Sequence, residues 1–256
     1  MIEVERITKR FAGVLAVDEV SLSVARGELL VLLGESGSGK TTLLKTINRL
    51  VEPSSGRVRI AGADVAAGPP HELRRRIGYV FQRIGLLPHL TAGENVAITP
   101  RLLGWPAERI RARVDELLEL VELDPGAVRD RLPESLSGGQ QQRVGVARAL
   151  AAGAEVMLLD EPFGALDPLT RDRLREAFGR IRRRLSLTAV LVTHDVAEAL
   201  SLGDRVAVLR GGRLLQIGAP ADLLQRPADE YVRDFVATPL RHAQQLAALL
   251  EVGSAR

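Results

Sequence analysis

Eight consecutive residues early in the chain have the types and the spacing of a phosphate-binding loop. Residues 34–41 read Gly-Glu-Ser-Gly-Ser-Gly-Lys-Thr and fit the pattern G-x-x-x-x-G-K-[ST] at every fixed position. Glycines let backbone N–H groups converge on phosphate oxygens, and the start of a following helix adds partial positive charge. Lys40 would bind the β- and γ-phosphates, and the Thr41 hydroxyl is placed for Mg²⁺. These residues predict that the chain binds a nucleoside triphosphate.

The residues expected to surround the phosphates lie in this loop and at the start of the next helix. They are Gly34, Ser36, Gly37, Ser38, Gly39, Lys40, Thr41 and Thr42. Lysine occurs only at Lys9, Lys40 and Lys45, in a chain that otherwise uses arginine. A compact charge on the phosphates explains why Lys40 is a lysine. The alternative, a glycine-rich turn without a ligand, is disfavoured because the whole pattern stands between an apolar strand and a helix.

Two carboxylates follow a later apolar run. Residues 156–159 are apolar and are followed by Asp160 and Glu161. Asp160 can hold Mg²⁺, and Glu161 can polarise the water that attacks the γ-phosphate. Alone, such a pair could be two solvated acids at the end of a strand. Together with the phosphate loop, it predicts hydrolysis.

A second glycine-rich turn repeats the logic of the first. Residues 136–140 read Leu-Ser-Gly-Gly-Gln and open a helical segment, so they predict another helix end that binds an anion. Two such ends, more than ninety residues apart, are best explained if each completes a different half of a site. We therefore expect two copies of the chain to associate head to tail.

Short apolar runs are expected to position these groups as strands. Buried strands are predicted at residues 29–33, 77–81, 156–160, 189–193 and 205–209. Helices between them indicate a parallel sheet. Residues 2–7 and 20–24 alternate apolar with polar side chains, which is typical of an antiparallel edge sheet. Residues from about 91 to 152 change to a helical pattern and predict a lobe inserted into the α/β core.

The composition restricts the function further. The chain has 256 residues, 46% of them hydrophobic and 26% charged, with a net charge of +3 that is too small to indicate nucleic acid. It contains no cysteine, which excludes disulfides, thiolate zinc sites and cysteine nucleophiles. No secretory signal is visible, and the apolar runs are too short to span a membrane. We expect a cytosolic chain unless a partner holds it at a membrane.

In order and content, these elements resemble the ATP-binding cassette (ABC) family over nearly the whole chain. The matching elements are Phe11, the loop 34–41, Gln82, residues 136–140, Asp160-Glu161, Ala165-Leu166-Asp167 and His194. The resemblance implies an α/β fold: a P-loop NTPase core, an antiparallel β edge subdomain and an inserted α-helical lobe. It also implies an ATPase that uses ATP and Mg²⁺. Phe11 is a departure, because many relatives carry Tyr or Trp there.

The resemblance assigns roles to single residues. The catalytic residues would be Glu161, His194, Lys40 and Gln82, with His194 on the γ-phosphate. The metal would be held by Thr41, Gln82 and Asp160. Besides the loop, the nucleotide would be contacted by Phe11, which would stack on adenine, and by Ser137, Gly138, Gly139, Gln140 and Asp167. Asp167 would also link the two sites of a dimer. Taken singly, Phe11 could be a core aromatic, Gln82 a loop amide and His194 a structural residue.

Other segments are similar to bacterial importers, and within them to the osmoprotectant branch. Residues 195–199, 216–220 and 231–236 carry the similarity to importers, and residues 47–56, 87–91 and 100–105 carry the similarity to that branch. That branch carries quaternary amines such as glycine betaine, carnitine and choline. The resemblance implies a membrane permease bound through residues of about 83–95, an extracytoplasmic solute-binding protein that acts indirectly, and a place on the cytoplasmic face of the membrane. An importer of another small solute, such as an amino acid or a polyamine, is the alternative.

Two further expectations concern the end of the chain and a rival function. We expect residues 220–250 to be helical, with an ATPase domain at residues 1–237 and a helical tail at 238–256, without the paired regulatory domains of many members of that branch. A soluble cassette protein acting on DNA or ribosomes is the rival, but no coiled-coil insertion or second cassette is visible. The basic run at residues 180–184 is read as a solvated helix face, so no nucleic acid is expected as a partner.

Overall fold

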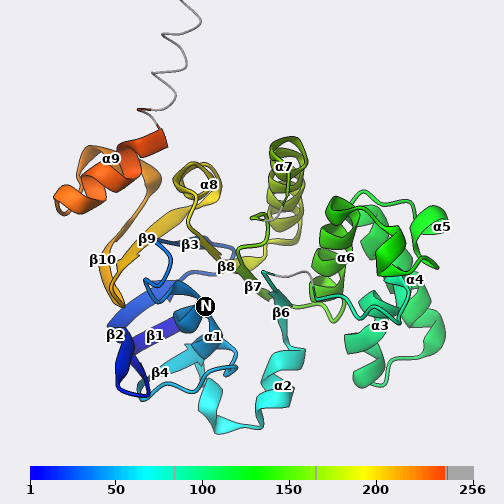
Figure 1. The fold of residues 1–256 in the computed structure, drawn as a ribbon. Helices are drawn as coiled ribbons and strands as arrows, with labels where there is room; N and C mark the ends of the chain where they lie inside the picture. The colour runs from blue at the N-terminus through cyan, green and yellow to red at the C-terminus, as the bar shows by residue number, and fades with distance from the viewer. Residues whose placement is uncertain (83–84, 165, 240, 242–256) are drawn as a thin grey trace, which may run out of the picture.

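The chain forms two sheets, a helical lobe and a set of helices that cover the larger sheet (Figure 1). The computed structural model describes residues 1–82, 85–164, 166–239 and 241. The smaller sheet has the order β2-β1-β4-β5 and is antiparallel. Its strands are β1 (Ile2–Phe11), β2 (Val14–Val24), β4 (Ser55–Ile60) and β5 (Ala63–Asp64).

The larger sheet brings the carboxyl ends of five strands to one edge. Its order is β10-β9-β3-β8-β7-β6. Among the described residues, β10 is the only strand of this sheet that pairs antiparallel with its neighbour. The strands are β3 (Leu29–Leu33), β6 (Ile77–Val80), β7 (Val156–Asp160), β8 (Thr188–Thr193), β9 (Arg205–Arg210) and β10 (Arg213–Gly218). Every residue of β3, β7 and β8 is buried, which explains why apolar side chains dominate their sequences.

Helices cover this sheet and frame its carboxyl edge. They are α1 (Lys40–Ile47), α2 (Pro70–Arg75), α7 (Pro168–Leu185), α8 (Val196–Leu202) and α9 (Pro220–Gln225), together with the 3₁₀ turn η1 (Val65–Ala67). The phosphate loop joins β3 to α1. The segment after β7 leads to α7, and the segment after β8 leads to α8. The predicted chemical groups therefore follow neighbouring strands at the same edge.

The helical lobe stands to the right of the larger sheet in Figure 1. It contains α3 (Ala92–Leu102), α4 (Ala107–Leu120), α5 (Pro125–Val128), the 3₁₀ turn η2 (Pro133–Ser135) and α6 (Gly138–Leu150). Capping boxes start α3 at Thr91 and α6 at Ser137, and satisfy backbone N–H groups that a helix start leaves open. Buried side chains of the lobe, such as Val114 and Leu117, share one core with Leu159 of the sheet.

The structure corrects two sequence expectations. Residues 220–250 were expected to be one helical tail, but α9 ends at Gln225 and helix resumes at residues 230–239. Most of the proposed 238–256 tail lies outside the described residues, so the division at 237 stays a prediction. The basic run in α7 is not simply solvated: Arg182 is buried and its Nη1 lies 2.6 Å from Asp204 Oδ2.

No helix in the described part of the chain is long and apolar enough to cross a membrane.

Candidate nucleotide site

The loop between β3 and α1 is shaped by glycines that approach other backbone closely. A Cβ atom on Gly34 would lie 2.3 Å from the Leu209 carbonyl oxygen, and one on Gly39 would lie 2.3 Å from that of Ala16. Gly39 also has a φ of +95° and is the residue before α1, where no side chain caps the helix. The first N–H groups of α1 therefore have no capping side chain and can bind an anion.

Lys40 is buried within this loop. Its Nζ donates to the carbonyl oxygens of Gly34 at 2.7 Å and Glu35 at 2.8 Å, and to Ser38 Oγ at 3.3 Å. Burial lowers the pKa of Lys40, and the carboxylates of Glu161 and Asp160 oppose that change by favouring the charged form. Lys40 is thus held by the loop and lies within the field of both predicted carboxylates.

Asp160 meets Thr41 as the metal prediction requires. Thr41 Oγ1 donates to Asp160 Oδ1 at 2.7 Å. Hydroxyl and carboxylate oxygens are the hard ligands that Mg²⁺ prefers, so these residues fit the ion. Among the described residues no group of three or more His, Cys, Asp or Glu could hold a metal by itself.

Two neighbours of Asp160 were missed by the sequence reasoning. Tyr79 OH donates to Asp160 Oδ2 at 3.3 Å, and Lys45 Nζ lies 3.9 Å from the same oxygen. Burial and the Asp160 charge raise the pKa of Tyr79, so its hydroxyl stays protonated and remains a donor. The scarcity of lysine could have drawn attention to Lys45. Tyr79 could be found only from the pairing of β6 with β7.

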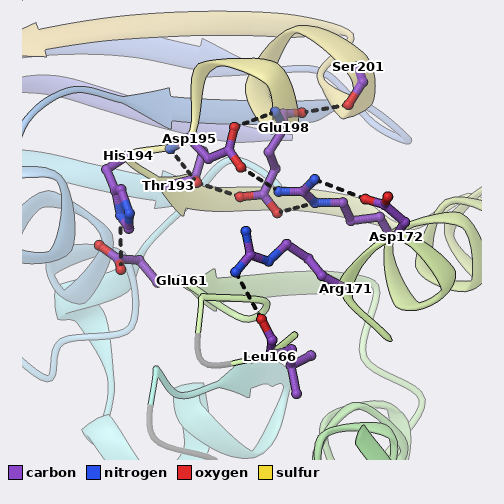
Figure 2. Close-up of polar contacts among 10 residues, drawn as sticks. Glu161, Leu166, Arg171, Asp172, Thr193, His194, Asp195, Glu198 and Ser201 are labelled. Atoms are coloured by element: carbon purple, nitrogen blue, oxygen red, sulfur yellow. Dashed lines mark hydrogen bonds and ion pairs between the residues drawn. The ribbon is translucent and has the colours of Figure 1, made fainter. Parts of the chain in front are cut away.

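Glu161 contacts two other predicted residues, Gln82 and His194. Its Oε2 lies 3.2 Å from His194 Nδ1 and accepts a hydrogen bond of 3.2 Å from Gln82 Nε2. Figure 2 shows the imidazole directed at this carboxylate. Glu161 has a φ of +45°, which is strained for a residue with a side chain, and its N–H donates to the Val192 carbonyl at 3.0 Å. The strained backbone is therefore anchored to β8.

The residues of the second glycine-rich turn lie elsewhere in the chain. Ser137 and Gln140 form the capping box of α6, and Ser137 and Gly138 are exposed. Helix α6 packs against α3, α4, α7 and β6, whereas α1 packs against β1, β2, β4, β7 and β8. Figure 1 shows α1 and α6 on different sides of the molecule. The start of α6 and the phosphate loop before α1 therefore belong to separate surfaces of one chain.

Asp167 and Phe11 also stand apart from the catalytic carboxylates. Asp167 caps α7 by accepting from the Thr170 N–H at 3.0 Å, and hydrogen bonds from Thr170 lower the pKa of Asp167. Phe11 is 45% exposed at the end of β1, with Lys9 Nζ 4.8 Å from its ring centre. An exposed ring is free to stack on a base. Ala165, the first residue of the 165–167 motif, lies outside the described residues.

Comparison with known proteins decides the family. A family profile described as ABC transporter matches residues 17–164, more than half of the chain. This chain belongs to the ABC transporter family. The fold class predicted from the sequence is also confirmed, because solved ABC cassettes superimpose on the structure. A dimeric ATP-binding cassette in a post-hydrolysis state bound to ADP and Pi is 33% identical, with a TM-score of 0.77 over 86% of this chain and 99% of that chain.

A second solved ABC protein covers more of the chain. It is cbiO1 from Clostridium perfringens, part of the ABC transporter complex cbiONQ, with 28% identity and a TM-score of 0.81 over 96% of this chain and 98% of that chain.

Curated relatives within the ABC family carry names that concern osmoprotectants. The glycine betaine/carnitine/choline transport ATP-binding protein OpuCA of Bacillus subtilis is 50% identical over 92% of this chain and 62% of its own length. The osmoprotectant import ATP-binding protein OsmV of Salmonella typhimurium is 50% identical over 92% of this chain and 63% of its own length. This chain therefore spans less than two thirds of the length of these relatives.

Proposed function

We propose that this chain is the ATP-hydrolysing subunit of an ABC importer. The observation that carries the proposal is the position of Glu161, whose Oε2 lies 3.2 Å from both Gln82 Nε2 and His194 Nδ1. The carboxylate follows Asp160 directly and lies at the same sheet edge as the phosphate loop. This arrangement suits a base that polarises the water attacking a γ-phosphate. A module that only bound nucleotide would not need a base beside a metal ligand.

The other residues would hold and orient the nucleotide. Loop N–H groups and Lys40 would bind the phosphates, and Thr41 with Asp160 would hold Mg²⁺, assisted by Gln82. Mg²⁺, when bound, would neutralise charge on the β- and γ-phosphate oxygens. His194 would contact the γ-phosphate from the side of Glu161. These roles follow the family pattern and are supported by the contacts of Lys40, Thr41 and Glu161.

We further propose that two copies of the chain enclose each nucleotide. Ser137 and Gly138 are exposed at the start of α6, away from the phosphate loop of the same chain. A partner copy could present this helix start to the nucleotide, with Asp167 linking the two sites. One solved relative is a dimeric ATP-binding cassette, which supports this arrangement.

A permease would bind to the helical lobe. A groove of about 420 Å³ is lined by Thr91, Gly93 and Glu94, within the expected 83–95 contact region, and by side chains of α3 and α4. Trp105 and Ile110 give it an apolar wall, and Arg109 lies over the Trp105 ring at 3.7 Å. A short amphipathic segment of a membrane subunit would suit such a groove. Residues 83 and 84 lie outside the described residues.

We assign a quaternary amine as the transported solute because relatives named for glycine betaine, carnitine, choline and osmoprotectant transport are about half identical. A sulfate/thiosulfate import ATP-binding protein of Mycobacterium tuberculosis is 48% identical over 90% of the chain, so another small solute remains the alternative. Uptake of radiolabelled glycine betaine or sulfate by membranes that carry the chain with its permease separates the two assignments.

Replacing the general base tests the activity itself. Glu161→Gln keeps the size of the side chain but removes its basicity, so we expect ATP turnover to fall by about 10²- to 10⁴-fold while ATP affinity stays within a factor of two to three. Phosphate release and nucleotide titration measure the two quantities, and Glu19→Gln, an exposed acid on β2, is the control. Normal turnover in Glu161→Gln would remove Glu161 from the mechanism. Stimulation by DNA or ribosomes, and not by a permease, would favour the soluble rival.

A further inference from the structure

A cluster of ion pairs joins α7 to α8 beside His194. Arg175 of α7 donates from Nη2 to Asp195 Oδ2 at 2.7 Å and from Nε to Glu198 Oε1 at 3.2 Å. A third, weaker contact of 3.4 Å joins its Nη1 to Asp172. The guanidinium thus uses its fork to hold the carboxylates of Asp195 and Glu198 at once.

The two carboxylates fix the backbone on both sides of His194. Thr193 Oγ1 donates to Glu198 Oε2 and accepts the Asp195 N–H at 3.0 Å. Asp195 caps α8 by accepting the Glu198 N–H at 3.1 Å. The residue before His194 and the residue after it therefore belong to one closed set of hydrogen bonds. Arg175 is the cation of that set.

Burial makes this cluster sensitive to the loss of its cation. The side chain of Glu198 is 5% exposed and that of Arg175 is 15% exposed. Burial raises the pKa of Glu198, and the hydrogen bond from Thr193 and the charge of Arg175 act against that rise. Burial alone would lower the pKa of Arg175, but Glu198 and Asp195 outweigh it and raise the pKa. A buried carboxylate left without its cation is costly, so the pairing is strongly favoured.

A side chain of α7 also holds the residues just before the helix. Arg171, one turn before Arg175, donates from Nη2 to the Leu166 carbonyl at 2.9 Å, and Asp167 caps the helix. A cavity of about 40 Å³, lined among others by Glu161, Arg171, Arg175 and His194, lies between α7 and the catalytic pair. Within the described part of the chain, the hydrogen bonds and ion pairs of Arg175 go to Asp172, Asp195 and Glu198, and none joins it to Glu161 or His194. Its influence on them must therefore pass through residues 193–198.

We propose that Arg175 is a positioning residue, which holds Asp195 and Glu198 so that His194 Nδ1 stays beside Glu161. The assignment rests on the proposed ATPase activity and adds to it a residue of α7 that touches none of the reacting groups. Because the fork binds both carboxylates, it fixes the orientation of α8 relative to α7. Any cation of a different shape would hold only one of them.

The kinetic test compares four purified chains: wild type, Arg175→Gln, Arg175→Lys and the control Arg173→Gln. Arg173 is exposed on the same helix, so its replacement removes the same charge from outside the cluster. We expect Arg175→Gln to lower kcat by about 10- to 100-fold, as a small misplacement of a catalytic group does, with the KM for ATP unchanged. The kcat of Arg175→Lys should lie between those of Arg175→Gln and wild type. Arg173→Gln should match wild type.

A spectroscopic readout separates this proposal from the proposed function. Nitrogen-15 signals of the imidazoles, with His194 assigned from a His194→Gln chain, report the surroundings of Nδ1 without any turnover. We expect the His194 signal to move in Arg175→Gln and Arg175→Lys and to stay in place in Arg173→Gln. If the wild-type chain does not hydrolyse ATP, but the His194 signal still differs between wild type and the two Arg175 variants, the proposed ATPase activity is contradicted and the positioning role of Arg175 stands.

The decisive negative result is equally specific. A folded Arg175→Gln chain with wild-type kcat and an unmoved His194 signal would overturn the proposal. If Arg175→Gln does not fold, Arg175→Lys decides, because it keeps the charge. Wild-type kcat and an unmoved signal in Arg175→Lys would show that the fork is not needed.

Discussion

Single residues determine the shape of the phosphate loop. Gly39 combines a left-handed φ of +95° with a backbone carbonyl where its Cβ would stand. Gly62, in the turn between β4 and β5, has a similar φ of +80° but nothing within 4 Å of a Cβ. A side chain would therefore strain the backbone at both glycines, but only at Gly39 would it also clash with another backbone atom.

This comparison predicts unequal effects of alanine. Gly62→Ala should cost about 1 kcal/mol of unfolding free energy, the usual cost of placing alanine at positive φ. Gly39→Ala should cost more and should also weaken ATP binding by at least about tenfold, because the loop must move away from Ala16. Urea unfolding and nucleotide titration of both chains measure the difference. Equal unfolding free energies with equal ATP affinities would show that the clash is relieved without moving the loop.

Residue types and spacing predicted most of the candidate site, but not its supports. Lys40, Thr41, Asp160 and Glu161 stand in local patterns that the sequence displays directly. The contacts of Tyr79 with Asp160 and of Arg175 with Glu198 join residues on different elements, and no local spacing marks them. Such partners follow from strand order and helix packing, which become visible only in the folded chain.

At the scale of elements, helix starts hold the functional residues in place. Ser137 caps α6, Asp167 caps α7 and Asp195 caps α8, so three residues in or beside predicted motifs are also structural caps. A loss of activity on replacing one of them can come from fraying of the helix. Unfolding free energies are needed beside rates when these positions are tested.

The pairing of α7 with α8 predicts a pH-dependent stability difference. Burial acts to raise the pKa of both Glu198 and Asp195, and the charge of Arg175 acts against burial at both carboxyls. Arg175→Gln removes this charge. Both folded-state pKa values should therefore rise in the variant. A carboxyl whose folded-state pKa rises loses stability as the pH increases past its unfolded value, which is about 4 for both residues.

The loss of unfolding free energy in Arg175→Gln relative to wild type should be small near pH 4 and should grow towards neutral pH. At neutral pH we expect up to about 3 kcal/mol, the lower end of the range for a broken buried pair, because Arg175 is partly exposed. Urea unfolding of Arg175→Gln, Arg173→Gln and wild type between pH 4.5 and about 7.5 measures it. A constant deficit across this range would show that Glu198 and Asp195 do not depend on Arg175.

Strands were predicted more closely than helix ends and surfaces. The run at residues 156–160 is β7 without any shift, because four apolar residues followed by Asp160 mark both the buried strand and its end. The tail departs from the expectation at residues 226–229, where the chain leaves the helix, because Pro227 lacks a backbone N–H and disfavours its continuation. Arg182 was misjudged because its partner, Asp204, lies at the start of another strand and leaves no mark in the sequence of α7.

At the scale of the whole molecule, the start of α1, the start of α6 and the lobe groove are built from different elements. The groove beside α3 and α4 predicts a specific role for Trp105. Trp105→Ala should lower the stimulation of ATP turnover by the permease and leave the turnover of the isolated chain unchanged, because Trp105 lies outside the catalytic groups. ATPase assays with and without the permease measure both rates. Leu132→Ala, an exposed residue outside the groove, is the control, and full stimulation of Trp105→Ala would place the permease elsewhere.

We propose that neither chain alone contains a complete site for hydrolysis. Sedimentation of the Glu161→Gln chain with and without Mg-ATP tests it most directly, because the variant should retain its nucleotide. We predict that ATP converts monomers into dimers, and that adding Ser137→Arg to the same chain prevents the conversion while ATP still binds. A chain that stays monomeric with ATP bound, or that dimerises equally well with Arg at position 137, would contradict the account.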